Sequence, residues 1–315
     1  MTTTNHGLGE ANGKIILLGE HSVVYGKPSI AIPFPAAKIK ATVLPSSDAT
    51  RIDCDFYHGL LDDMPELLES LKETIRVTLN YLGKDDTFLH ITIESQIPAE
   101  RGMGSSAAVS VATTRALYDY FDIDLSHEQL LKIVDVSEKI AHGNPSGLDA
   151  LMTSSSTPYY YIKGEPFEAL NLNLNAYLIV GDTGQTGQTK DAVASIAEKL
   201  TNLQKDQTKA HISSLGTLAN EGRHFLENNE PLKLGITMSK VHTILQELGV
   251  SSPELNLLVD TAMANEALGA KLTGGGRGGC MIALAGNKND AKKIAKALEI
   301  SGAKQTWLYD MRRSN

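Results

Sequence analysis

Apolar and polar residues alternate over segments 38–43 and 88–95, which predicts two half-exposed strands. Between them, apolar residues recur at helical spacing over 65–82, and Gly83 follows where such a helix would end. A short apolar run at 14–18 predicts a strand near the start of the chain. The residues predicted to point inward from the 38–43 strand are Ile39, Ala41 and Val43.

Helical patterns dominate the rest of the chain, most strongly from about residue 189. The pattern predicts a helix over 126–142 that starts with a Ser-x-x-Gln capping box, formed by Ser126 and Gln129. The other predicted elements are strands at 159–162, 176–181, 280–285 and 305–309 and helices at 105–121, 208–228, 231–248, 252–268 and 290–300. Strands and helices mix without a regular βαβ rhythm, which favours an α+β fold with two layers in each half.

The length of 315 residues favours two domains. We place their boundary near 170–175, so that residues 1–172 form an N-terminal domain and residues 173–315 a C-terminal domain.

Composition excludes several classes of function. No apolar stretch approaches the roughly 18 residues that a membrane span needs, and the polar N-terminus has no signal-peptide core. The net charge of −8 without a basic stripe argues against nucleic-acid binding. Cys54 and Cys280 stand far apart, in neither a metal nor a redox spacing. We therefore expect a cytoplasmic protein that binds any anionic ligand through local features.

A glycine–serine loop, PAERGMGSSAA at 98–108, lies between the predicted strand ending at Ser95 and the helix beginning near Ser105. Glycines allow close backbone approach, and the free N–H groups and dipole of a helix N-terminus attract phosphate. The loop lacks the Gly-Lys-Ser/Thr of a Walker A motif, so a lysine must come from elsewhere. The alternative is a capped core helix, in which Ser105 and Ser106 only cap.

A second cluster, KLTGGGRGGC at 271–280, has five glycines between Gly274 and Gly279. Glycine is entropically costly to order, so this density indicates a backbone that approaches something closely, such as a nucleotide or substrate. The alternative is a loose hairpin turn.

Three charged residues could supply phosphoryl-transfer chemistry. This chemistry needs one carboxylate to hold Mg²⁺ and another to orient or deprotonate the attacking hydroxyl, and Glu138 and Asp149 flank a predicted break in the chain. Lys14 could be the basic group that the serine loop lacks. The alternatives are a solvated Glu138 paired with His142, an Asp149 that caps a short helix, and a solvated Lys14.

These segments, in this order, resemble the galactokinase–homoserine kinase–mevalonate kinase–phosphomevalonate kinase superfamily over essentially the whole chain. KIILLGEHSVVYGKPSIAI at 14–32 is similar to its first motif, GMGSSAA at 102–108 to its phosphate loop, and KLTGGGRGGC to its third motif. The combination of GEHSVVYGK with AHGNPSGLD is similar to the mevalonate kinase family in particular.

The resemblance implies an ATP-dependent kinase that uses Mg²⁺ and phosphorylates the primary hydroxyl of mevalonate. It implies a ribosomal-protein-like N-terminal half and a ferredoxin-like C-terminal half, with the active site between them. The nucleotide would be bound by Ser95, Glu100, Arg101, Gly102, Met103, Gly104, Ser105 and Ser106. Ser106 and Glu138 would also ligate Mg²⁺, and Asp149 would take the substrate proton beside Lys14. Glu20, His21 and Thr189 would line the mevalonate site with Lys14 and Asp149.

One position departs from the family pattern: some members have an arginine where this chain has Gly187. The group that binds the mevalonate carboxylate is therefore open between His21 and Lys190. Other kinases of the superfamily, such as phosphomevalonate kinase or galactokinase, remain alternatives, as do a non-catalytic metabolite-binding regulator and a structural interaction protein. A homodimer is common in the family.

Overall fold

The computed structural model describes residues 6–143 and 145–312, without the side chains of residues 141 and 142. Contacts between residues divide the chain into two compact units that interleave along the sequence. The described part of the first unit is residues 6–14, 37–99, 104–143 and 145–156. The second unit holds residues 15–36, 100–103 and 157–312.

The first unit contains a mixed sheet. Strands β1 (Gly7–Leu18) and β2 (Ser29–Pro45) pair with each other and contribute residues to both units. In the first unit β2 pairs antiparallel with β5 (Leu89–Ser95), which runs parallel to β3 (Arg51–Cys54). The edge strand β4 (Tyr57–Leu60) pairs with β3. Both alternating segments are therefore strands, and Ile39, Ala41 and Val43 are buried as predicted.

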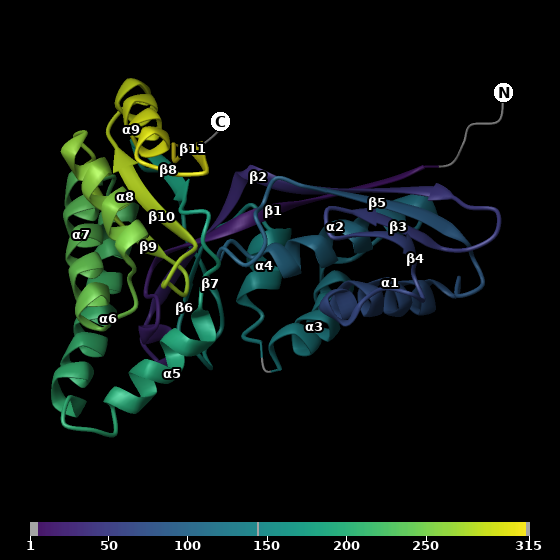
Figure 1. The fold of residues 1–315 in the computed structure, drawn as a ribbon, viewed down its shortest axis with the longest axis horizontal. Helices are drawn as coiled ribbons and strands as arrows, with labels where there is room; N and C mark the ends of the chain where they lie inside the picture. Colours follow the sequence, from purple (N-terminus) through teal and green to yellow (C-terminus); the bar gives the residue numbers. More distant parts are fainter. Residues whose placement is uncertain (1–5, 144, 313–315) are drawn as a thin grey trace. The chain divides into compact units, whose positions relative to one another are not determined.

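The described residues of the first unit also form the α-helices α1 (Glu69–Leu82), α2 (Ser105–Tyr120), α3 (His127–His142) and α4 (Leu148–Ser154). Helices α1, α2 and α3 pack on one another (Figure 1). The capping prediction is confirmed, because Ser126 Oγ accepts a hydrogen bond from the Gln129 N–H. The predicted 65–82 helix begins late: Pro65 is extended and a 3-10 turn, η2 (Glu66–Leu68), precedes α1.

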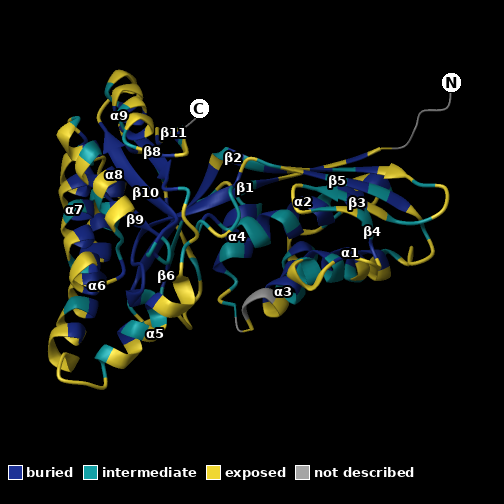
Figure 2. Cartoon of the chain, in the orientation of Figure 1, coloured by how far each residue is buried: buried dark blue, intermediate teal, exposed yellow. Residues whose placement is uncertain are grey.

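The second unit contains an antiparallel sheet in the order β11 (Gln305–Asp310), β8 (Tyr177–Asp182), β10 (Cys280–Ala285), β9 (Gly269–Thr273). Numbered along the chain, this is the order 4-1-3-2 of a ferredoxin-like sheet. Figure 2 shows that β10 is buried along its length. The start of β2 pairs with β6 (Tyr159–Tyr161), which in turn pairs with β7 (Glu168–Ala169).

The α-helices in the described part of the second unit are α5 (Thr189–Lys199), α6 (Lys205–Glu227), α7 (Pro231–Glu247), α8 (Pro253–Ala264) and α9 (Lys288–Ile300). Helices α7, α8 and α9 pack against the sheet. The predicted helix over 252–268 is too long, since α8 ends at Ala264 and β9 starts at Gly269. Gly269 lies so close to α7 that a Cβ atom there would be 1.8 Å from the Gly235 carbonyl oxygen.

The predicted two-domain α+β class is confirmed. Within the described residues, no helix combines the length and apolarity that a membrane crossing requires. The ribosomal-protein likeness of the first half stays a prediction.

Candidate active site

Lys14 and Asp149 form an ion pair in the first unit. Lys14 Nζ lies 2.9 Å from Asp149 Oδ1, and the two side chains are 9% and 32% exposed. Lys14 comes from β1, and Asp149 stands in the first turn of α4, whose N-cap is Gly147. A solvated Lys14 and a capping Asp149 are therefore both wrong. The Asp149 carboxylate remains partly exposed to solvent, so it can reach a ligand and accept a proton from it.

Glu138 is buried on α3 near this pair. Burial raises the pKa of its carboxyl to about 7, and the negative charge of Asp149 adds to the shift. Ser106 and Lys14 oppose it. The alternative of a solvated Glu138 is wrong, and its suggested partner, the side chain of His142, lies outside the described residues. A buried carboxyl of this kind favours a cation beside it when it ionises.

Ser106 stands in the first turn of α2, close enough to Glu138 to lower the pKa of that carboxyl. Its Oγ is buried and hydrogen-bonds the Glu138 carboxyl. A buried hydroxyl and a buried carboxyl held side by side fit the oxygen ligands that Mg²⁺ prefers. No group of three His, Cys, Asp or Glu residues in the described chain could hold a metal, so phosphate and water would have to complete the coordination.

Gly104 is the N-cap of α2, with φ 74° and no side-chain cap. A Cβ atom there would lie 2.7 Å from Lys14 Cγ, so only glycine lets the loop pass over the lysine. Ser105 and Ser106 lie inside the helix, and the interpretation of them as caps is wrong. The N–H groups of this helix end remain available to an anion.

The preceding residues of the loop, 100–103, belong to the second unit. Glu100 has a φ of 58°, and Met103 is fully buried. The Arg101 guanidinium pairs with Asp182 at 3.1 Å and donates to Thr186 Oγ1 and the Gly184 carbonyl, both at 3.0 Å. The Arg101 side chain is therefore already hydrogen-bonded within the second unit. A phosphate at this part of the loop would be bound by backbone groups.

The second glycine cluster packs tightly against other segments of its own unit. Cβ atoms would lie 1.9 Å from Thr189 Oγ1 at Gly275 and 2.0 Å from the Val250 carbonyl oxygen at Gly276. At Gly278 the same atom would be 2.4 Å from the Thr186 carbonyl oxygen. The cluster does connect the antiparallel strands β9 and β10, as the hairpin alternative expected, but the connection is tightly packed rather than loose. Close approach by the protein's own chain already requires these glycines, so a role toward a ligand stays a prediction.

Glu20 and Lys271 form a fully buried ion pair in the second unit. Lys271 lies on β9, and Glu20 precedes the 3-10 turn η1 (Ser22–Tyr25). The sequence interpretation assigned no role to Lys271. Its signal was a lysine in an otherwise apolar strand, which needs a buried partner.

His21 is buried with φ 59°. Burial lowers the pKa of its imidazole to about 4, although a hydrogen bond with the Gly275 backbone opposes the shift. His21 is therefore neutral at pH 7, and among the described residues its Nε2 has no hydrogen-bond partner. Thr189 and Lys190 are exposed in the first turn of α5.

Ser95 Oγ in the first unit donates to the Ile97 carbonyl oxygen at 2.8 Å. The structure thus gathers Lys14, Ser106, Glu138 and Asp149 in the first unit. It places Glu20, His21 and Thr189 in the second unit.

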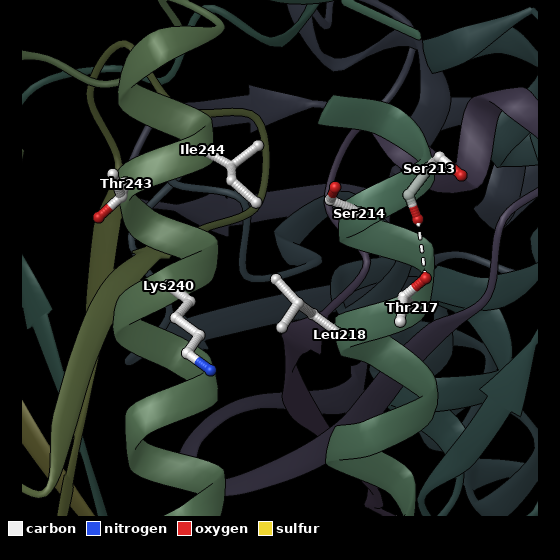
Figure 3. A pocket seen from close by; sticks show the side chains of 7 residues that line it. All are labelled: Ser213, Ser214, Thr217, Leu218, Lys240, Thr243 and Ile244. Carbon is white, nitrogen blue, oxygen red and sulfur yellow. Dashed lines mark hydrogen bonds between the residues drawn. The ribbon is translucent and has the colours of Figure 1, made fainter. Parts of the chain in front are cut away.

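A groove of about 530 Å³ lies between α6 and α7. Figure 3 shows its side chains, which include Lys240 and Ile244 of α7 and Leu218 of α6. None of its lining residues is a predicted site residue. The groove therefore does not include the charged cluster of Lys14, Glu138 and Asp149.

Comparison with known proteins identifies the family of this chain. Residues 69–156 match the family model for the GHMP kinases N terminal domain, and residues 210–304 match the one for the GHMP kinases C terminal region. The matches lie on either side of the predicted boundary at 172/173, which itself stays a prediction.

A mevalonate kinase of Pyrococcus abyssi (strain GE5 / Orsay) is 35% identical over 321 residues, covering 94% of this chain and 92% of the relative. The solved mevalonate kinase of methicillin-resistant Staphylococcus aureus MRSA252 is 33% identical, with a TM-score of 0.78, covering 98% of this chain and 100% of that one. L. major mevalonate kinase, solved in complex with R-mevalonate, is 26% identical with a TM-score of 0.82, covering 100% and 97%. The chain therefore belongs to the GHMP kinases and, within them, to the mevalonate kinase family.

Proposed function

We propose that this protein transfers the γ-phosphoryl group of ATP to the primary hydroxyl of mevalonate, giving 5-phosphomevalonate and ADP in the mevalonate route to isoprenoids. Its relatives are named mevalonate kinases, and one of them was solved with R-mevalonate bound. The observation that carries the proposal is the Lys14–Asp149 pair, with Glu138 and Ser106 beside it at the start of α2.

Asp149 acts as the general base in this proposal. The substrate hydroxyl oxygen bonds to the γ-phosphorus, the bond from that phosphorus to the β,γ-bridging oxygen breaks, and the hydroxyl proton passes to the Asp149 carboxylate. Lys14 orients that carboxylate, because its ammonium lies 2.9 Å from Asp149 Oδ1. Lys14 also offers positive charge to the phosphoryl oxygens as charge develops on them.

Ser106 and Glu138 hold the metal ion in this proposal. The bound Mg²⁺ would neutralise negative charge on the phosphate oxygens, and phosphate and water oxygens would complete its ligands. The buried Ser106 hydroxyl beside the Glu138 carboxyl and the raised pKa of that carboxyl support this assignment. Glu138→Gln should raise the Mg²⁺ requirement, and an unchanged Mg²⁺ titration would count against ligation by Glu138.

The nucleotide site is proposed to run along the loop of Glu100, Arg101, Gly102, Met103, Gly104, Ser105 and Ser106, near Ser95. Positive φ angles at Glu100, Gly102 and Gly104 support backbone approach to phosphate, as does the N-terminus of α2. Because the Arg101 side chain is held by Asp182, Thr186 and Gly184, we assign no phosphate contact to it.

Glu20, His21 and Thr189 are proposed to line the mevalonate site. The neutral, buried His21 can form a hydrogen bond with mevalonate through Nε2, but at pH 7 it cannot form an ion pair with the mevalonate carboxylate. The exposed Lys190 at the start of α5 therefore becomes the favoured partner of the mevalonate carboxylate. Lys190→Met should raise the KM for mevalonate and leave the KM for ATP unchanged.

The function is tested by a coupled ADP-release assay with mevalonate, phosphomevalonate, galactose and homoserine as acceptors. We expect turnover with mevalonate and background rates with the other three. Turnover with another acceptor in its place would assign a different activity within the superfamily, and no turnover with any acceptor would support a non-catalytic binding protein.

We also propose a cytoplasmic location and a homodimer. Light scattering after size exclusion separates a dimer from the monomer mass of 33.9 kDa.

A further inference from the structure

Three hydroxyl side chains form a continuous buried contact through the helices of the first unit. Ser137 Oγ on α3 lies 2.7 Å from Ser110 Oγ on α2, and Ser110 Oγ lies 3.1 Å from Thr74 Oγ1 on α1. Thr74 Oγ1 also lies 2.8 Å from the Ser70 carbonyl oxygen. We call Thr74, Ser110 and Ser137 the hydroxyl seam. All three residues are buried.

The seam is fully hydrogen-bonded. Each hydroxyl has one proton. Thr74 donates either to the Ser70 carbonyl or to Ser110 Oγ, and one of the two serines donates to the other, so each of the three hydroxyls has a partner. A buried hydroxyl without a partner destabilises a fold, and these three hydroxyls avoid that cost. The seam is therefore a directional contact between three helices, which apolar packing alone does not provide.

Two seam residues, Ser110 and Ser137, lie on the same helices as the proposed metal ligands and close to them along the chain. Ser110 stands one helical turn after Ser106 on α2, on the same face of that helix. Ser137 immediately precedes Glu138 on α3. The hydrogen bond between Ser110 and Ser137 therefore restrains the rotation and spacing of the two helices at the point from which Ser106 and Glu138 project.

We propose that the hydroxyl seam positions Ser106 and Glu138 for the metal ion. This inference rests on the proposed function, in which both residues ligate Mg²⁺. Ser110 and Ser137 touch neither the substrates nor the metal in this proposal, so they are positioning residues. Outer-shell partners of metal ligands typically change metal affinity by about 10- to 100-fold when they are mutated.

The chain offers a matched control. Thr78 Oγ1 of α1 and Thr114 Oγ1 of α2 lie 3.5 Å apart, and both residues are buried. This pair also joins two helices of the same bundle, but Thr114 is two turns from Ser106 and neither residue adjoins Glu138. Thr78 Oγ1 also donates to the Thr74 carbonyl oxygen at 2.6 Å. Removing the pair tests the effect of losing a buried hydroxyl contact while all three seam hydroxyls are kept.

The experiment compares wild type with Ser110→Ala/Ser137→Ala and with Thr78→Val/Thr114→Val. Removing both partners of a contact leaves no unsatisfied hydroxyl between them, so both double variants are expected to fold. The measurements are the Mg²⁺ activation constant with saturating ATP and mevalonate, the binding of Mn²⁺ with a non-hydrolysable ATP analogue by electron paramagnetic resonance, and the thermal midpoint.

We expect the seam variant to weaken both Mg²⁺ activation and Mn²⁺ binding by about tenfold or more. The control variant should change both by less than about twofold at a similar loss of thermal midpoint. Equal metal constants in the seam variant and wild type, or an equal weakening in the control, would overturn the inference. Should the seam double variant not fold, Ser137→Cys, which keeps the volume but hydrogen-bonds weakly, takes its place with the same expected direction.

Failure of the proposed function is distinguishable from failure of this inference. A wild-type protein that shows no Mg²⁺-stimulated ADP release with mevalonate refutes the function. The Mn²⁺ measurement still decides whether the seam positions a metal site.

Discussion

Lys14 Nζ lies 2.9 Å from Asp149 Oδ1, which joins the first strand of the chain to the first turn of α4. The lysine is almost fully buried, whereas about a third of the aspartate side chain is exposed. A buried ammonium needs its counter-ion, and a partly exposed carboxylate can still meet a ligand. The pair therefore stabilises the buried Lys14 ammonium and leaves the Asp149 carboxylate accessible to a ligand.

Asp149→Asn should lower kcat by at least about 10² to 10⁴-fold, because the amide cannot accept the substrate proton. The KM for ATP should change little, since the nucleotide is assigned to the loop at 100–106. Steady-state kinetics with mevalonate and ATP varied separately measure both constants. Activity within a few-fold of wild type would remove Asp149 from the role of base.

Gly104→Ala should destabilise the fold and slow catalysis together. Alanine in this left-handed position costs about 1–2 kcal/mol, and its Cβ would in addition lie 2.7 Å from Lys14 Cγ. Gly83→Ala is the matched control, because Gly83 has φ 64° and open space around it. Denaturant unfolding should show a loss of about 1–2 kcal/mol for the control and more for Gly104→Ala. Equal losses would show that the contact with Lys14 is not restrictive.

Lys271→Met should destabilise the protein by about 3–5 kcal/mol, because it leaves the Glu20 carboxylate buried without its counter-ion. The double variant Glu20→Gln/Lys271→Met should recover more than half of this loss, since no unpaired charge remains. A double-mutant cycle from urea unfolding measures the coupling. Additive losses would mean that the two groups do not stabilise each other.

Stability should depend on pH through Glu138. Its pKa rises from 4.5 to about 7 on folding, so between these values the folded protein binds a proton that the unfolded chain has lost. The contribution of Glu138 to the free energy of unfolding is therefore present below pH 4.5 and declines as the pH rises towards 7. The total change is up to about 3 kcal/mol.

The measurement is urea unfolding of metal-free wild type and Glu138→Gln from pH 5 to pH 8. The difference in unfolding free energy, wild type minus variant, should fall as the pH rises. A difference independent of pH would mean that Glu138 ionises normally in the folded protein. Adding Mg²⁺ with ADP should reduce the pH dependence if Glu138 ligates the metal.

Local pattern predicted most elements of this fold because burial alternates with a period of two in strands and 3.6 in helices. The alternating segments became β2 and β5, and the capping box at Ser126 was found at the start of α3. The error at 252–268 has a tertiary cause, since α8 stops where the chain must turn to bring Gly269 against α7. The short helix α4 was foreseen only within the alternative role of Asp149, because seven residues are too few to establish a period.

The sequence by itself determined the kinds of chemistry present: a glycine–serine loop before a helix, two acidic residues around a chain break, and a lysine near the first strand. Only the tertiary structure decided which of these groups meet. It paired Lys14 with Asp149, set Glu138 beside Ser106, and gave Glu20 a lysine partner 251 residues away. Propensity and periodicity report on neighbours along the chain. Through-space pairing, and the burial that moves the pKa of Glu138, arise only when distant segments pack together.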